Sequence, residues 1–162
     1  FRREAGSYGK DTKGILRVHQ FDKLEMVSFT KAGQSKEEFD FLLSMQEKLV
    51  QGLKLPYHLL AVSTGDLPKP SAKVIDLECW IPSENKYRET HSVSNCTDFQ
   101  ARRLNIRYKE NGQNHFVHTL NGTAFAMPRI IIAIIENYQT KDGTIKVPAV
   151  LQKYMGMEEI GG

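Results

Sequence analysis

The chain has 162 residues, of which 40% are hydrophobic and 25% charged, and its formal net charge is +3. This composition is typical of a single globular domain and argues against a disordered chain. The longest apolar run, residues 130–135, is far shorter than the ~18 residues that cross a bilayer, so no membrane partner is expected. The small net charge does not by itself indicate nucleic-acid binding.

Two features of the sequence bear on its origin. Cys79 and Cys96 are its only cysteines, too few for a disulfide framework or a thiolate zinc site, so free thiols in a reducing cytoplasm are predicted. No targeting segment is visible at the start. The sequence opens at Phe1, without an initiator Met and within a predicted strand, so we expect it to be a fragment of a larger protein.

The first 30 residues are predicted to form two antiparallel strands, residues 1–5 and 15–30, joined by a glycine-rich loop. Successive side chains of a strand alternate between its faces. One face of the second strand would therefore carry Arg17, His19, Phe21, Lys23 and Glu25. A face that combines a guanidinium, an aromatic ring and a carboxylate suits a ligand platform better than plain solvent.

The clearest helix is predicted over residues 35–53. Ser35 is expected to cap it, with Glu38 three residues further on completing a capping box. Apolar residues recur at helical spacing along one side, so this helix is expected to pack against the core. Gly52 lies near the predicted end, where a helix commonly unwinds.

The rest of the chain is predicted to be mainly strands. They cover residues 57–64, 74–81, 86–94 and 115–120. Asp98 is expected to cap a short helical turn. Residues 121–123 are expected to interrupt the preceding strand. Pro128 suits the first turn of a buried helix over 129–138, and the tail to residue 162 is expected to pack loosely or not at all. This pattern predicts an α+β domain with an antiparallel sheet flanked by helices.

Three segments carry a more specific signal. Residues 1–29 begin with Phe1-Arg2-Arg3-Glu4, residues 88–103 begin with Arg88-Glu89-Thr90-His91-Ser92, and residues 121–139 begin with Asn121-Gly122-Thr123. In this order they resemble the class II aminoacyl-tRNA synthetases, in the form found in seryl-tRNA synthetases. The first segment is similar to motif 2, the second to the segment that holds ATP and Mg²⁺, and the third to motif 3.

The resemblance implies a class II catalytic core. Residues 1–162 would form a partial catalytic domain, without motif 1 and without the N-terminal helical hairpin that binds tRNA. It also implies a homodimer for the full-length protein. The loop over residues 6–14, with Lys10 and Lys13, resembles the segment that meets the acceptor end of tRNA.

The resemblance implies two catalytic arginines. Amino-acid activation joins two anions, a carboxylate and a triphosphate, so the site must supply fixed positive charge. Arg2 matches the residue placed on the α-phosphate and the serine carboxylate. Arg129 matches the residue that holds the γ-phosphate at the start of a helix, where the helix dipole also favours an anion. Without the resemblance, Arg2 would be read as a surface ion-pair partner of Glu4.

The implied ATP site is larger than these two arginines. It comprises Arg2, Arg3, Glu4, Arg17, Val18, Phe21, Glu89, Thr90, His91, Ser92 and Arg129. Phe21 would stack under adenine, and Glu4 would accept from the adenine amino group. Glu89 and Ser92 would hold Mg²⁺, which prefers a few hard oxygen ligands and keeps several waters. His91 is given no catalytic role, because in a regular strand it is expected to alternate away from this pair.

The implied serine site consists of Glu25, Asn121 and Thr123. Glu25 would pair with the α-ammonium group, and Thr123 would bond the serine hydroxyl, with Asn121 beside it. A buried hydroxyl partner would discriminate against alanine. As an alternative, Glu25 could form an exposed salt bridge with Lys23 or Lys31, and Asn121 could belong to a plain turn.

The resemblance thus implies a cytoplasmic serine–tRNA ligase. Such an enzyme uses ATP and Mg²⁺ to form seryl-adenylate and then loads tRNA(Ser). We expect the fragment by itself to be weakly active or inactive. The alternatives are a non-catalytic paralogue, or a paralogue of the same core that loads a carrier protein. Retention of all the motif residues favours the ligase.

Overall fold

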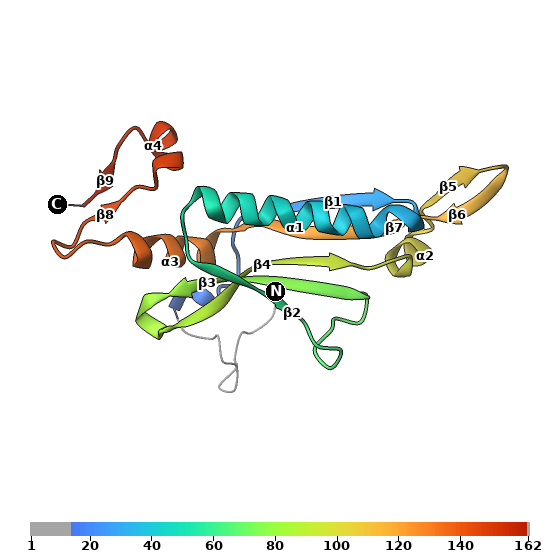
Figure 1. Ribbon diagram of the computed structural model, residues 1–162, viewed down its shortest axis with the longest axis horizontal. Helices are drawn as coiled ribbons and strands as arrows, with labels where there is room; N and C mark the ends of the chain where they lie inside the picture. Colours follow the sequence, from blue (N-terminus) through green and yellow to red (C-terminus); the bar gives the residue numbers. More distant parts are fainter. Residues whose placement is uncertain (1–13, 162) are drawn as a thin grey trace.

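The computed structural model describes residues 14–161, so the predicted strand over residues 1–5 and most of the loop that follows lie outside the described residues. An antiparallel sheet of five strands in the order β1-β7-β4-β3-β2 forms its centre (Figure 1). These strands are β1 Lys23–Thr30, β2 Tyr57–Ala61, β3 Lys73–Ile81, β4 Lys86–Asn95 and β7 His118–Ala126. Together with its helices, the sheet confirms the predicted α+β class.

Two helices, α1 (Ser35–Gly52) and α3 (Met127–Tyr138), supply the apolar side chains that cover the sheet. Phe39 and Leu42 of α1 pack with Val93 of β4 and Leu120 of β7. Further along, a second cluster joins the end of α1 to α3 through strand β3. The predicted helix over 35–53 and its core-facing stripe are therefore confirmed.

The predicted capping box at the start of α1 is wrong. The helix follows a short 3-10 turn, η2 (Ala32–Gln34), and its N-cap is Gln34. The Ser35 hydroxyl donates to the Ala32 carbonyl at 3.1 Å, whereas the Glu38 carboxylate accepts from the Ser28 hydroxyl on β1 at 2.7 Å. The turn and the neighbouring strand thus use the two side chains that the box would need.

The predicted strand over residues 15–30 is only half correct. Residues Gly14–Leu16 form a 3-10 turn, η1, and residues 17–22 lead irregularly into β1, which begins at Lys23. The ladder between β1 and β7 ends at the pair Lys23↔Ala126, because β7 gives way to α3 at Met127. Residues 17–22 therefore have no β7 backbone beside them to pair with.

The predicted interruption at residues 121–123 is also wrong, because β7 runs through them. A Cβ atom on Gly122 would lie 3.2 Å from the Gln46 amide nitrogen and 3.4 Å from a Val93 methyl. Glycine is thus favoured here by the close approach of α1, and not by a turn. The strand predicted over 115–120 is divided between β7 and the hairpin of β5 (Arg107–Glu110) and β6 (Gln113–Phe116).

Smaller elements complete the chain. They are η3 Pro82–Glu84, α2 Phe99–Leu104, β8 Ile145–Lys146, α4 Ala149–Met155 and β9 Glu159–Ile160. Asp98 precedes α2, but its carboxylate binds Arg102 and does not cap the helix. The tail is more ordered than predicted, because Val147 is buried and Leu151 packs against the α1–α3 core. Within residues 14–161, no helix has the length and apolarity needed to cross a membrane.

Candidate functional site

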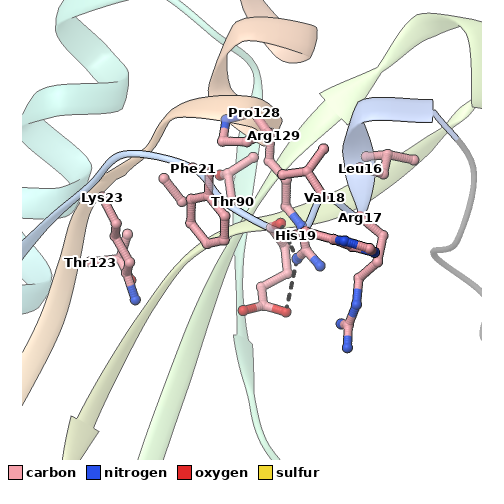
Figure 2. A pocket seen from close by; sticks show the side chains of 12 residues that line it. Leu16, Arg17, Val18, His19, Phe21, Lys23, Thr90, Thr123, Pro128 and Arg129 are labelled. Carbon is pink, nitrogen blue, oxygen red and sulfur yellow. Dashed lines mark hydrogen bonds and ion pairs between the residues drawn. The ribbon is translucent and has the colours of Figure 1, made fainter. Parts of the chain in front are cut away.

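A cavity of about 670 Å³ opens between the segment before β1, the strands β4 and β7, and the start of α3 (Figure 2). Its lining comprises Leu16, Arg17, Val18, His19, Phe21, Lys23, Glu89, Thr90, Thr123, Ala126, Pro128 and Arg129. Seven of these are predicted site residues, contributed by segments far apart in the sequence. The volume lies within the range of about 300–1,000 Å³ that is usual for small-molecule sites.

The aromatic wall of the cavity comes from the irregular segment before β1. Phe21 is 48% exposed, unusually open for a large aromatic side chain. Arg17, Val18 and His19 line the same cavity. Four of the five predicted platform residues thus line the cavity, without Glu25 and together with Leu16 and Val18, because the segment is bent and does not alternate as a strand.

The cationic part of the cavity is Arg129, the third residue of α3. Pro128 occupies the first turn of this helix, as predicted. One guanidinium nitrogen of Arg129 donates to the Glu89 main-chain carbonyl at 2.8 Å and lies 3.2 Å from the Glu89 carboxylate (Figure 2). Arg129 is thus held across the cavity by β4, at the start of a helix, where the helix dipole favours anions.

A β-bulge brings Glu89 and Ser92 to the same face of the sheet. Residues three apart on a regular strand point to opposite faces. Here Asp76 of β3 is opposite Ser92, and Glu78 is opposite Glu89, so Thr90 is the extra residue on β4. Because Asp76 and Glu78 are two residues apart and share a face, their partners Ser92 and Glu89 share it too.

Asp76 is a residue of this region that the sequence analysis did not identify as functional. Partial burial raises the pKa of its carboxyl group, a hydrogen bond from Ser92 opposes the rise, and the nearby Glu89 and Glu78 carboxylates add to it. The alternation of β3 places Asp76 and Glu78 on one side of the strand, and this pairing of two carboxylates is the feature of the sequence that could have pointed to Asp76. Its position opposite Ser92 depends on the register, which the sequence does not show.

The oxygen donors here fit Mg²⁺. In residues 14–161, no group of three or more His, Cys, Asp or Glu side chains has the arrangement of a metal site. Mg²⁺ needs fewer protein ligands than that, because it retains several waters and binds substrate phosphates. The Glu89 carboxylate is half exposed to solvent, and Ser92 adds a hydroxyl on the same face, so a partly hydrated ion fits these residues.

The predicted serine-binding residues lie next to one another. Glu25 of β1 is directly opposite Thr123 of β7, and Asn121 is two residues away on the same face of β7. Thr123 is buried and lines the cavity. The Glu25 carboxylate lies 2.8 Å from the Lys23 ammonium group. This is the salt bridge that the sequence offered as an alternative to a role of Glu25 in binding substrate.

Two of the described ATP-site residues do not line the cavity: Ser92, which shares a face with Glu89, and the buried His91. Its side chain is only 1% exposed, and its ring meets the edge of Phe125 at 5.9 Å between centroids. The imidazole Nδ1 lies 2.8 Å from the Thr90 hydroxyl. Burial lowers the pKa of His91 to about 4, while a hydrogen bond with the Ala124 backbone opposes this, so the ring is neutral at pH 7.

The remaining predicted residues of motif 2 are Arg2, Arg3 and Glu4, together with Lys10 and Lys13 of the loop. They lie outside the described residues. Their roles stay predictions.

The fold and the cavity together define a class of protein. Residues 1–138 match the family model described as the tRNA synthetase class II core domain (G, H, P, S and T). The chain belongs to this family.

Individual relatives point to one branch of the family. The chain is 57% identical over 155 residues to a serine–tRNA ligase of Nautilia profundicola, and 53% identical over 161 residues to that of Thermosipho melanesiensis. These alignments cover 96% and 99% of this chain but 37% and 38% of the relatives. The chain thus spans less than two-fifths of the length of the curated relatives it matches.

A solved structure agrees. The chain is similar to the seryl-tRNA synthetase of Pyrococcus horikoshii complexed with ATP, with a TM-score of 0.93 and 49% identity. This similarity covers 99% of the chain and 36% of the solved one. The antiparallel sheet with flanking helices is therefore the fold of the seryl-tRNA synthetase catalytic core.

Proposed function

We propose that this chain forms part of the catalytic domain of a serine–tRNA ligase, which activates serine with ATP and transfers it to tRNA(Ser). The observation that carries the proposal is the composition of one cavity. It combines an open aromatic ring, Phe21, with a guanidinium, Arg129, a carboxylate, Glu89, and a buried hydroxyl, Thr123. These groups suit a nucleobase, a polyphosphate, a divalent cation and a small polar amino acid, in that order.

In the proposed reaction, a carboxylate oxygen of serine attacks the α-phosphorus of ATP. The bond from the α-phosphorus to the bridging oxygen breaks, and pyrophosphate leaves with that oxygen, so seryl-adenylate remains. The tRNA then takes the seryl group through a terminal ribose hydroxyl, and AMP leaves. No redox change occurs in either step.

The side chains of the cavity would divide the work of the first step. Phe21 stacks on adenine and thereby orients the nucleotide. Arg129 leaves its contact with Glu89 and neutralises the γ-phosphate at the start of α3. Glu89 and Ser92 would hold Mg²⁺, which when bound offsets the charge of the phosphates. Arg2, Arg3 and Glu4 are proposed to complete the nucleotide site.

The amino acid would bind beside the nucleotide, at the pair formed by Glu25 and Thr123. Glu25 would exchange the Lys23 ammonium group for the α-ammonium group of serine. Thr123 bonds the serine hydroxyl, with Asn121 next to it. Alanine would leave this buried hydroxyl without a partner, so the site favours serine.

The domain assignment, the quaternary state and the location belong to the same proposal. Residues 1–29, 88–103 and 121–139 serve as the three motif segments, and the complete protein acts as a homodimer in the cytoplasm.

The test is serine-dependent exchange of pyrophosphate into ATP. It is run on this chain alone and on a chimaera in which residues 1–162 replace the matching segment of the Nautilia profundicola ligase. Alanine and threonine serve as control amino acids, each tested in place of serine. We expect exchange in the chimaera with serine and far less with the other two.

The chain alone and the chimaera answer different questions. Exchange in the chimaera but not in the chain alone supports the ligase function and shows that activity needs the rest of the relative. Exchange in both identifies this chain as a self-sufficient activation core. A folded chimaera without serine-dependent exchange overturns the proposal and favours a non-catalytic or carrier-loading paralogue.

A further inference from the structure

Strands β4 and β7 separate at the floor of the cavity. They pair only through Val93↔Gly122, Ser94↔Asn121 and Asn95↔Leu120. Beyond Val93 and Gly122, β4 continues beside β3 and β7 continues beside β1. The next residue on each strand, Ser92 and Thr123, therefore stands at the vertex of a fork, and both are proposed to touch substrate or Mg²⁺.

A side chain from α1 occupies that vertex. The amide nitrogen of Gln46 donates to the Ser92 carbonyl and to the Thr123 carbonyl, each at 2.9 Å. Gln46 is fully buried. Its amide thus replaces the ladder hydrogen bonds that a Ser92↔Thr123 pair would otherwise make.

The chemistry of the amide fixes its orientation. Two carbonyl oxygens are acceptors only, so the NH₂ group must face them, and its two N–H bonds satisfy one each. Its own oxygen is then buried without a hydrogen-bond partner among the described residues. Burying an unpaired acceptor is costly, and an apolar side chain would avoid it. The two hydrogen bonds that Gln46 donates offset the cost of its unpaired oxygen.

The surroundings fit the amide closely. Gly122 is the residue beside it, and a Cβ atom there would lie 3.2 Å from the Gln46 nitrogen. Phe39 and Leu42 hold α1 against the sheet from the same side. The amide therefore has little freedom, and the separation of the two carbonyls is set by one nitrogen atom.

We propose that Gln46 is a positioning residue that sets the spacing of Ser92 and Thr123, and hence of the Mg²⁺ and serine subsites across the fork. The inference rests on the proposed function. If it is correct, the KM for serine and the Mg²⁺ requirement depend on whether the side chain of residue 46 can donate two hydrogen bonds, and not only on its volume.

The test compares Gln46→Met with Gln46→Glu in the chimaera. Methionine keeps the length of the side chain without a donor, and glutamate keeps the shape but turns acceptor oxygens toward the two carbonyls. We expect the KM for serine to rise about tenfold or more in both variants, with a higher Mg²⁺ concentration at half-maximal exchange. AMP binding, followed by calorimetry, should change less than about twofold, because Phe21 lies on a different segment.

Two controls separate positioning from stability. Val50→Ala removes a buried side chain of the same helix from the cluster formed with β3 and α3, away from the fork, so it should lower the melting temperature and leave the KM for serine unchanged. Gln113→Met makes the same chemical change at an exposed position of β6 and should alter neither the melting temperature nor the KM for serine.

The outcomes distinguish this inference from the proposed function. An inactive wild-type chimaera refutes the proposed function. An active wild type with Gln46 variants whose serine KM and Mg²⁺ dependence match those of Val50→Ala refutes the positioning role. A selective rise in serine KM with unchanged AMP binding supports it.

Discussion

Acidification should destabilise this fold through one buried histidine. His91 of β4 is buried beside Phe125 of β7, and burial holds its pKa at about 4, against 6.5 for an ordinary histidine. Between these two values the unfolded chain binds a proton that the folded chain does not. Stability is therefore fully retained above pH 6.5 and falls as the pH drops toward 4.

The magnitude follows from the difference between the two pKa values. A gap of about 2.5 units corresponds to roughly 3 kcal/mol in the free energy of unfolding, most of it lost by about pH 4.5. For a chain of this size, a loss of roughly 2.5 kcal/mol lowers the melting temperature by roughly 5–10 °C.

The assay is urea unfolding of residues 1–162 at intervals between pH 7.5 and 4.5, followed by circular dichroism. In His91→Gln the amide can still bond the Thr90 hydroxyl but does not titrate, so its stability should be nearly flat between pH 6.5 and 4.5. His115→Gln, at an exposed position of the β5–β6 hairpin, should keep the wild-type slope.

If the wild type and His91→Gln lose stability in parallel over this range, titration of His91 is not the cause of the loss. The acid sensitivity would then come from other groups, and the ring of His91 would be accessible to protons in the folded state.

Three further predictions concern the cavity and the core. Arg129→Ala should lower kcat for pyrophosphate exchange in the chimaera about 100-fold or more, with an unchanged melting temperature, because the side chain acts on developing charge. Phe21→Ala should raise the KM for ATP about tenfold while Phe21→Tyr changes it little, because stacking needs only a ring; equal effects in steady-state assays would contradict stacking. Phe39→Ala should cost roughly 3–5 kcal/mol in urea unfolding, because Phe39 is buried, whereas the exposed Phe41→Ala should cost well under 1 kcal/mol.

Much of the fold follows from local patterns. The apolar spacing of residues 35–53 predicted α1, and Pro128 before a run of isoleucines predicted α3. Alternation predicted β3 and β4. These predictions succeed because burial of one face imposes on the sequence a period of 3.6 residues in a helix and of 2 residues in a strand. The capping box failed because its two polar side chains have partners on a turn and on a neighbouring strand.

The residue types of the site also follow from the sequence. Phe21, Glu89, Thr123 and Arg129 were identified from their motif context, and the structure gathers them around one cavity. Gln46 is at helical spacing with the core-facing stripe of α1, but the sequence gives no sign of its role at the site. Its two partners, Ser92 and Thr123, are 46 and 77 residues away.

The sequence by itself determined which residues are available for chemistry, and most of the segments that become helices and strands. Only the tertiary structure decided how they face one another. The extra residue at Thr90 turns Glu89 and Ser92 to one side, and the end of the β1–β7 ladder releases the segment that carries Phe21. Both features depend on where distant backbones stop pairing, and long-range pairing leaves no period in the local sequence.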